Sequence, residues 1–316
     1  MDEADAVPGR PAGRPAVVAI GGGHGLAASL RAIRRYAASA VAIASVADDG
    51  GSSGRLRRDH PGLPAPGDIR RCLGALAADE SVLGAALEHR FETGALAGHA
   101  LGNLVLASLT ESHGSFAEAV DELGRLIGAV GRVLPATVEP VALVALRTAA
   151  DHDGQARMHR VVGQVAVQGS TGIAEVRLHP RSPQSPPEVA AAIAGADQVV
   201  LGPGSLFTSV LAAAVVPAVH RALAETRGRK IYIANLAPQV PETDGFTVAD
   251  ELNALRNHGV GIDQVVVDPT RPLGEPCRAI EVVTASMTNP RGPGHDPAAL
   301  AEVLASLLWP AVEGTR

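Results

Sequence analysis

The feature that most constrains this fold is a pair of apolar runs, each followed by a glycine-rich loop. Residues 16–20 read AVVAI and run into GGGHG at 21–25, while residues 40–46 read AVAIASV and precede DDGGSSGR at 48–55. Between the two runs, apolar residues recur at helical spacing at Leu26, Leu30 and Ile33. Strands that are apolar on nearly every residue are covered on both faces, as in parallel sheets. The order strand, glycine loop, helix and strand predicts a β-α-β arrangement.

Later segments extend this pattern and interrupt it twice. Helical patterns follow one another from about residue 68 to 130 and predict a helical insertion. The segments 138–147, 162–168 and 173–178 have a β-like pattern and predict a small β-rich patch. The α/β alternation then returns through apolar segments at 197–209, 230–236 and 263–268 and a last helix at about 297–309.

Together these segments predict an α/β protein with a Rossmann-like, doubly wound, mainly parallel sheet. The first fifteen residues are acidic and rich in Pro and Gly, without an apolar core. We therefore expect residues 1–15 to form a disordered tail without a signal peptide, and residues 16–316 to form one domain.

Composition excludes several classes of function. The net charge of -6 gives no large positive field, and aromatic residues make up 2% of the chain, which leaves few platforms for stacking bases. General nucleic-acid binding is therefore disfavoured, although the composition leaves room for a local basic patch. The apolar stretch at 210–219 contains a proline and is shorter than the roughly 20 residues that span a bilayer. We expect a soluble, cytoplasmic protein without a membrane span.

The GGGHG loop is suited to phosphate binding. Ligands of parallel sheets collect at the carboxyl ends of the strands, where glycines let an anion approach the amides of the next helix. The candidate residues here are Gly22, Gly23, His24 and Gly25. Leu26 stands where the dinucleotide fingerprint requires a glycine, and no GxxxxGK[ST] motif occurs in the chain. The glycines could also serve only as a tight turn.

The second loop carries more chemistry in fewer residues. Its candidate ligand-binding residues are Asp48, Asp49, Gly50, Gly51, Ser52, Ser53 and Arg55. The carboxylates suit Mg²⁺ or ribose hydroxyls, and the hydroxyls and the guanidinium suit phosphate oxygens. Alternatively, the loop is a solvated turn in which the aspartates cap the next helix.

Other segments repeat this combination of glycine and polar side chains. LGPGSLFTS at 201–209 contributes Gly202, Pro203, Gly204, Ser205 and Thr208, although Ser205 could be only an N-cap. Asp68 is placed to cap a helix, and His99 and Asn103 of GHALGN could share a helix face near the glycine loops. A lone histidine more often satisfies a local hydrogen bond.

Five motifs, taken in order, make the chain resemble a known family. DDGGSSGRLR, PGDIRRCLGAL, GHALGN, LGPGSLFTS and NLAPQVPETDGFT resemble those of the YvcK gluconeogenesis factors, which are related to the CofD phospholactate transferases. The last motif adds Asn235, Gln239, Thr243 and Asp244 to the candidate site. GPGSLFTS and PETDGFT resemble the YvcK form, whereas the transferases typically carry GPxNPxTS.

This resemblance implies a cytoplasmic protein that binds UDP-sugars, notably UDP-N-acetylglucosamine. It also implies support of cell-wall synthesis and cell shape on gluconeogenic carbon sources. The possible partners are proteins of peptidoglycan synthesis and further copies of the same chain, and the resemblance does not decide between them. A binding or regulatory protein is the leading hypothesis, because the loops show no evident nucleophile and base.

Two alternatives from other classes remain. In one, the chain is an Mg²⁺-dependent CofD-like transferase that moves a phospholactyl-type group from a guanylylated donor to a deazaflavin alcohol, with Asp48, Asp49 and Asp68 as candidate metal ligands. In the other, it is an NAD-linked oxidoreductase, which Leu26 in the fingerprint disfavours.

Overall fold

The computed structural model describes residues 13–150, 155–275, 280–290 and 292–308. Residues 1–12 of the expected N-terminal tail lie outside these ranges, and the assignment of residues 16–316 to one domain stays a prediction. Within the described residues, no single helix is long and apolar enough to cross a membrane. One pair of consecutive segments, Leu206–Ala214 and Pro217–Glu225, meets the length and composition criteria only jointly and is bent by 77°.

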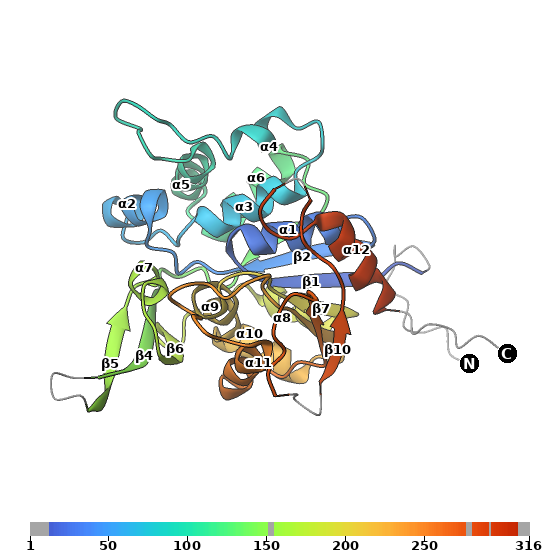
Figure 1. Ribbon diagram of the computed structural model, residues 1–316. Helices are drawn as coiled ribbons and strands as arrows, with labels where there is room; N and C mark the ends of the chain where they lie inside the picture. Colours follow the sequence, from blue (N-terminus) through green and yellow to red (C-terminus); the bar gives the residue numbers. More distant parts are fainter. Residues whose placement is uncertain (1–12, 151–154, 276–279, 291, 309–316) are drawn as a thin grey trace.

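A seven-stranded sheet forms the centre of the molecule (Figure 1). Its spatial order is β10-β9-β8-β7-β1-β2-β3, and every neighbouring pair is parallel. The strands are β1 (Ala16–Gly21), β2 (Ser39–Ala44), β3 (Arg132–Pro135), β7 (Gln198–Leu201), β8 (Arg229–Ile233), β9 (Gln264–Val267) and β10 (Glu281–Thr284). The predicted doubly wound parallel sheet is therefore confirmed.

The chain changes direction across this sheet at β1. Strands β2 and β3 lie on one side of β1, while β7 to β10 lie on the other. Ile20 of β1 is in register with Ile43 of β2 and Leu201 of β7, so the loops that follow these strands start at the same level. Open α/β sheets bind ligands beside such a switch point.

Helices cover both faces of the sheet (Figure 1). The upper side in this view carries α1 (Gly23–Ile33), α2 (Gly51–Asp59), α3 (Gly67–Leu76), α4 (Val82–Ala86), α5 (Leu101–His113), α6 (Phe116–Leu126) and α12 (Pro297–Ser306). The lower side carries α8 (Pro187–Ala194), the π-helix η1 (Leu206–Leu211), α9 (Ala212–Ala214), α10 (Pro217–Glu225) and α11 (Val248–Asn257).

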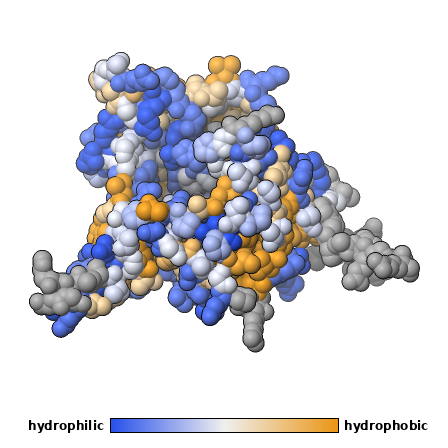
Figure 2. All heavy atoms as spheres, viewed as in Figure 1, coloured by the Kyte–Doolittle hydropathy of each residue, from blue (hydrophilic) through white to orange (hydrophobic). Residues whose placement is uncertain are grey.

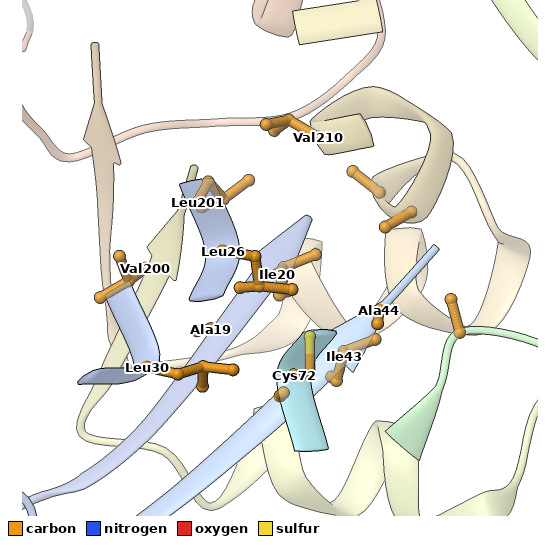
Figure 3. Packing of buried hydrophobic residues seen from close by; sticks show 14 of the residues in the cluster. Ala19, Ile20, Leu26, Leu30, Ile43, Ala44, Cys72, Val200, Leu201 and Val210 are labelled. Atoms are coloured by element: carbon orange, nitrogen blue, oxygen red, sulfur yellow. The ribbon is translucent and has the colours of Figure 1, made fainter. Parts of the chain in front are cut away.

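The core extends over both faces of the sheet, and β1 and α1 contribute to it (Figure 3). The predicted stripe Leu26, Leu30 and Ile33 is fully buried, as is Ile20. Burying a side chain of this size contributes about 1.5–3 kcal/mol. The stripe therefore fixes α1 on the sheet, and with it the loop at its N-terminus.

A smaller antiparallel sheet projects from one end of the molecule, at lower left in Figure 1. Its order is β5-β4-β6, formed by β5 (Ala156–Val162), β4 (Ala142–Ala150) and β6 (Ile173–His179). The predicted β-rich patch is present, but most of residues 162–168 form the helix α7 (Gln164–Gln168) instead of a strand. Gly163 turns the chain at φ 102°, and the Asp49 carboxylate accepts the first two amides of α7.

Candidate functional site

A cavity of about 430 Å³ lies beside the switch point, between α2 and α7. The loops after β1, β2 and β7 line it, with the starts of α3 and α5. Fifteen of the predicted site residues line it: Gly22, Gly23, His24, Gly25, Asp48, Gly50, Gly51, Ser52, Ser53, Asp68, Asn103, Gly204, Ser205, Thr208 and Gln239. In Figure 2, hydrophilic residues gather over the upper left of this face, where α2 and the α5 region lie.

The N-termini of α1 and α2 both reach this cavity. Their N-caps are Gly22 and Gly50, and neither first turn contains an acidic residue. The first-turn amides of an α-helix have no intrahelical partner and carry partial positive charge. The two termini therefore favour a bound anion.

Two glycines let the lining elements come into direct contact. A Cβ on Gly25 would overlap the backbone carbonyl of Pro203, and a Cβ on Gly22 would overlap the Asp68 carboxylate. Any larger residue at either position would push the loops apart. These glycines thus hold together the segments that follow β1 and β7.

Asp48 and Asp68 supply negative charge to the cavity. Asp68 pairs with Arg71 at 2.9 Å and accepts the Gly23 amide, while Asp48 accepts the Gly50 amide at 2.9 Å. Burial raises the pKa of Asp68 above its ordinary value; the negative charge of Asp48 adds to the rise, and Arg71 opposes it.

Asp49, the other aspartate of the DDGGSSGR loop, does not line the cavity. Both carboxylate oxygens of Asp49 accept amides of α7, from Gln164 at 3.1 Å and Val165 at 2.9 Å. The carboxylate that shares the cavity with Asp48 is Asp68, so the predicted pair Asp48 and Asp49 does not converge. Over the described ranges, no group of three His, Cys, Asp or Glu side chains could hold a metal ion.

Mg²⁺ nevertheless suits two carboxylates when substrate phosphates complete its coordination. The cavity offers that donor set in Asp48 and Asp68.

Ser52 joins α2 to the start of α5. Its hydroxyl oxygen lies 3.3 Å from the Ala100 amide, 3.0 Å from Asn103 Nδ2 and 3.1 Å from His99 Nδ1. Asn103 is 2% exposed, and its Oδ1 has no hydrogen-bond partner among the described residues. The GHALGN segment is therefore held against the DDGGSSGR loop.

The loop after β7 differs, because Glu242 occupies the N-terminus of η1. Its Oε1 accepts the amides of Phe207 at 2.7 Å and Thr208 at 3.2 Å, and its Oε2 accepts the Thr208 hydroxyl at 3.1 Å. Burial raises the pKa of Glu242, and these hydrogen bonds oppose the rise. An internal carboxylate thus takes the donors that a bound anion would otherwise use.

The remaining predicted residues do not line the cavity. Asn235 hydrogen-bonds Gly204 through both its Oδ1 and its Nδ2, and Thr243 accepts the Gln239 amide at 2.8 Å. Arg55 packs against Gly98, and Asp244 is exposed. Gly202 and Pro203 precede Gly204 in the chain and do not line the cavity, and the Pro203 carbonyl packs against Gly25. Asn235 and Thr243 therefore position cavity residues instead of facing the cavity.

Sequence reasoning missed several lining residues: Gly67, Arg70, Arg71, Arg90, Gln164, Val165 and Gln168. Arg70 and Arg71 lie two and three residues after Asp68 in PGDIRRCLGAL, so their position in the first turns of α3 could have revealed them. Gln164 and Gln168 share a helix face, which the β-like interpretation of this segment concealed.

Unpartnered buried polar atoms concentrate in the residues that line this cavity. Seven such atoms occur in the described part of the chain, and four belong to cavity residues: Arg70 Nε, Arg71 Nε, Asn103 Oδ1 and Gln239 Oε1. Buried polar groups of native proteins nearly always have partners, so this concentration indicates a site for a polar ligand.

Residues 17–282 match the family model described as 2-phospho-L-lactate transferase CofD. A Mycobacterium tuberculosis protein named "Putative gluconeogenesis factor" is 42% identical over 91% of this chain and 89% of its own length. A "Gluconeogenesis factor" of Halalkalibacterium halodurans is 40% identical over 83% of this chain and 80% of its own.

A solved structure has the same fold. The crystal structure of a UPF0052 family member from Bacillus halodurans superposes with a TM-score of 0.82 and 34% sequence identity. The match covers 93% of this chain and 99% of that chain.

Proposed function

The chain belongs to the CofD family and, within it, to the YvcK group of gluconeogenesis factors, and we propose that it binds a nucleotide-sugar of the UDP-N-acetylglucosamine type. The observation that carries this proposal is the group of four unpartnered polar atoms in one cavity at the switch point. Such a site suits a ligand that offers both hydrogen-bond donors and acceptors.

The polar groups of the cavity match the parts of such a ligand. The amides at the starts of α1 and α2, with Arg70 and Arg71, would bind the diphosphate oxygens. Asn103 Oδ1 and Gln239 Oε1 would accept hydrogen bonds from hydroxyls or an amide N–H. Both charge and hydrogen-bonding capacity therefore support a sugar diphosphate ligand.

The cavity also favours binding over covalent catalysis. Ser52 is the lining hydroxyl with a histidine neighbour, but two N–H groups and His99 Nδ1 already surround its oxygen. An oxygen so engaged is a poor nucleophile. We therefore assign the chain a binding and regulatory role in the cytoplasm, as a gluconeogenesis factor that supports cell-wall synthesis and cell shape on gluconeogenic carbon sources.

Calorimetry with UDP-N-acetylglucosamine tests this proposal. Replacing Arg71→Ala should weaken binding by about ten-fold or more, because a hydrogen bond to a charged group is worth about 1.5–3 kcal/mol. Arg71→Lys should lose less, and Arg125→Ala is the matched control, since Arg125 lies on the exposed face of α6 and pairs with Glu122. No heat with the unaltered protein at millimolar ligand would refute the proposal.

Asp48 and Asp68, together in one cavity, favour a second candidate, the Mg²⁺-dependent transferase. These two residues would hold Mg²⁺, which would neutralise charge developing on a transferred phosphoryl group. Arg71 would keep the Asp68 carboxylate oriented. Incubation with Mg²⁺, a guanylylated phospholactyl-type donor and a deazaflavin alcohol should then yield product by mass spectrometry, and Asp68→Asn should abolish it. Absence of product rules this candidate out.

A further inference from the structure

The Ser52 hydroxyl has three nitrogen neighbours and one hydrogen. The Ala100 amide can only donate, so it takes one lone pair of Ser52 Oγ. The hydroxyl hydrogen must then go either to His99 Nδ1 or to the Asn103 side chain. The two choices exclude each other and couple the state of His99 to that of Asn103.

With neutral His99, Ser52 donates to Nδ1 and accepts from Asn103 Nδ2. Asn103 lines the cavity, and its Oδ1, a hydrogen-bond acceptor, is then left without a partner among the described residues. With protonated His99, Nδ1 donates to Ser52, whose hydrogen must turn to Asn103. The amide of Asn103 then flips, and its NH₂ group, a donor, faces the cavity. Protonation of His99 thus replaces a hydrogen-bond acceptor of Asn103 with a hydrogen-bond donor at the cavity.

We propose that His99 is a positioning residue that acts through Ser52 to hold Asn103 with its acceptor toward the cavity, so that the site selects ligands with a hydroxyl or amide N–H at that point. The inference rests on the proposed nucleotide-sugar binding and adds that Asn103 accepts a hydrogen bond from the sugar. An analogue without that hydrogen-bond donor would leave the buried Asn103 acceptor unpaired. The unpaired acceptor makes the binding free energy of the analogue less favourable, and the site therefore selects against it.

His99 is placed to favour the acceptor arrangement. The charged groups that face it are Arg55 and Asp59 of α2 and Arg90 beside the bridge to Ala100. Partial burial, helped by Arg55, lowers the pKa of His99 below its ordinary value of 6.5. At neutral pH the imidazole is therefore neutral, and Asn103 presents Oδ1.

Linkage then fixes the sign of a pH effect. A ligand donor on Asn103 Oδ1 stabilises neutral His99, so binding lowers the pKa of His99 further and affinity falls as the pH falls through that pKa. The diphosphate of a nucleotide-sugar is diesterified and does not titrate here. His24 also lines the cavity, but its protonation would strengthen anion binding. The two histidines therefore act with opposite signs.

The test compares the unaltered chain with His99→Asn, with UDP-N-acetylglucosamine as the probe. Asn at this position has an acceptor oxygen and no titration. The unaltered protein should lose affinity on the order of ten-fold between pH 7.5 and a pH below 6.5, and His99→Asn should lack this acid-side loss whatever its affinity at pH 7.5. An equal loss in both proteins would overturn the inference.

Nitrogen NMR of the free protein gives a readout that needs no ligand. It should show neutral His99 with its proton on Nε2, and adding the probe should lower the pKa of His99. A proton on Nδ1 at pH 7.5 would also overturn the inference. Binding without any pH step assigned to His99 would sink this inference alone, whereas no binding at any pH would sink the proposed function with it.

Discussion

The loops after β1 and β7 have similar sequences but different structural roles. Both follow neighbouring parallel strands, both are rich in glycine, and each precedes a helix. One amide at the start of α1, that of Gly23, goes to the Asp68 carboxylate, whereas two first-turn amides of η1 are taken by Glu242 from a segment over 30 residues away. A glycine loop before a helix therefore predicts an anion site only to the extent that carboxylates of the chain leave its amides free.

Asp49 shows the same effect at α7. Its carboxylate accepts the first two amides of that helix, while Asp48, its neighbour, faces the cavity. An internal carboxylate takes two amides at η1 and at α7, whereas it takes a single amide at α1 and at α2, so more donors stay available to the cavity at those two termini. Substitutions can test this difference directly.

The largest effect is expected at Glu242. Glu242→Ala would leave two buried amides and a hydroxyl unpaired, so we expect the free energy of unfolding to fall by about 3 kcal/mol in urea denaturation. Glu242→Gln keeps an acceptor and should lose about 1 kcal/mol. If Glu242→Ala is as stable as the unaltered protein, η1 does not depend on this carboxylate and the comparison fails.

A smaller effect is expected where the two loops touch. Gly25→Ala should cost about 2 kcal/mol, because the added Cβ would overlap the Pro203 carbonyl and force the backbone apart. Gly23→Ala is the matched control: its φ is +67° but no atom lies near the added Cβ, so about 1 kcal/mol is expected. Equal losses in thermal or urea denaturation would mean that the close approach is unimportant.

The smallest effect concerns His24 in the first turn of α1. Burial and the charge of Arg71 lower the pKa of His24 below 6.5, so the side chain is neutral at pH 7. Its protonation would add a positive charge beside the bound diphosphate, and affinity should rise a few-fold as the pH falls through this pKa. Calorimetry in a His99→Asn background isolates the effect, and a second change, His24→Asn, should remove it. A rise that survives the second change contradicts this role.

Much of the fold was predictable because local patterns and tertiary structure agree. The apolar runs that became β1 and β2 are buried on both faces, and Leu26, Leu30 and Ile33 form the buried stripe of α1 as their spacing predicted. Disagreement arose where a distant group decided the outcome. Residues 164–168 form a helix whose first two amides donate to Asp49. Residues 87–91, which belong to the expected helical insertion, all lie outside α4 (Val82–Ala86), and Arg90 forms a bridge with Ala100.

The candidate site was predictable to the same extent. Glycine loops at strand ends indicated where Gly22, Asp48 and Gly204 would meet, since parallel strands bring their carboxyl ends to one edge. The sequence did not reveal the role of Glu242, because that role depends on how its segment packs against the start of η1.

By itself, the sequence determined a parallel α/β sheet and the edge at which its ligand-binding loops gather. Hydrophobic periodicity and glycine punctuation act over a few residues, so a linear reading captures them. Only the tertiary structure decided which helix N-termini stay open, which of two adjacent aspartates faces the cavity, and that His99, Ser52 and Asn103 form one hydrogen-bonded chain. These outcomes depend on hydrogen bonds between groups far apart in sequence, whose geometry exists only after the segments have packed.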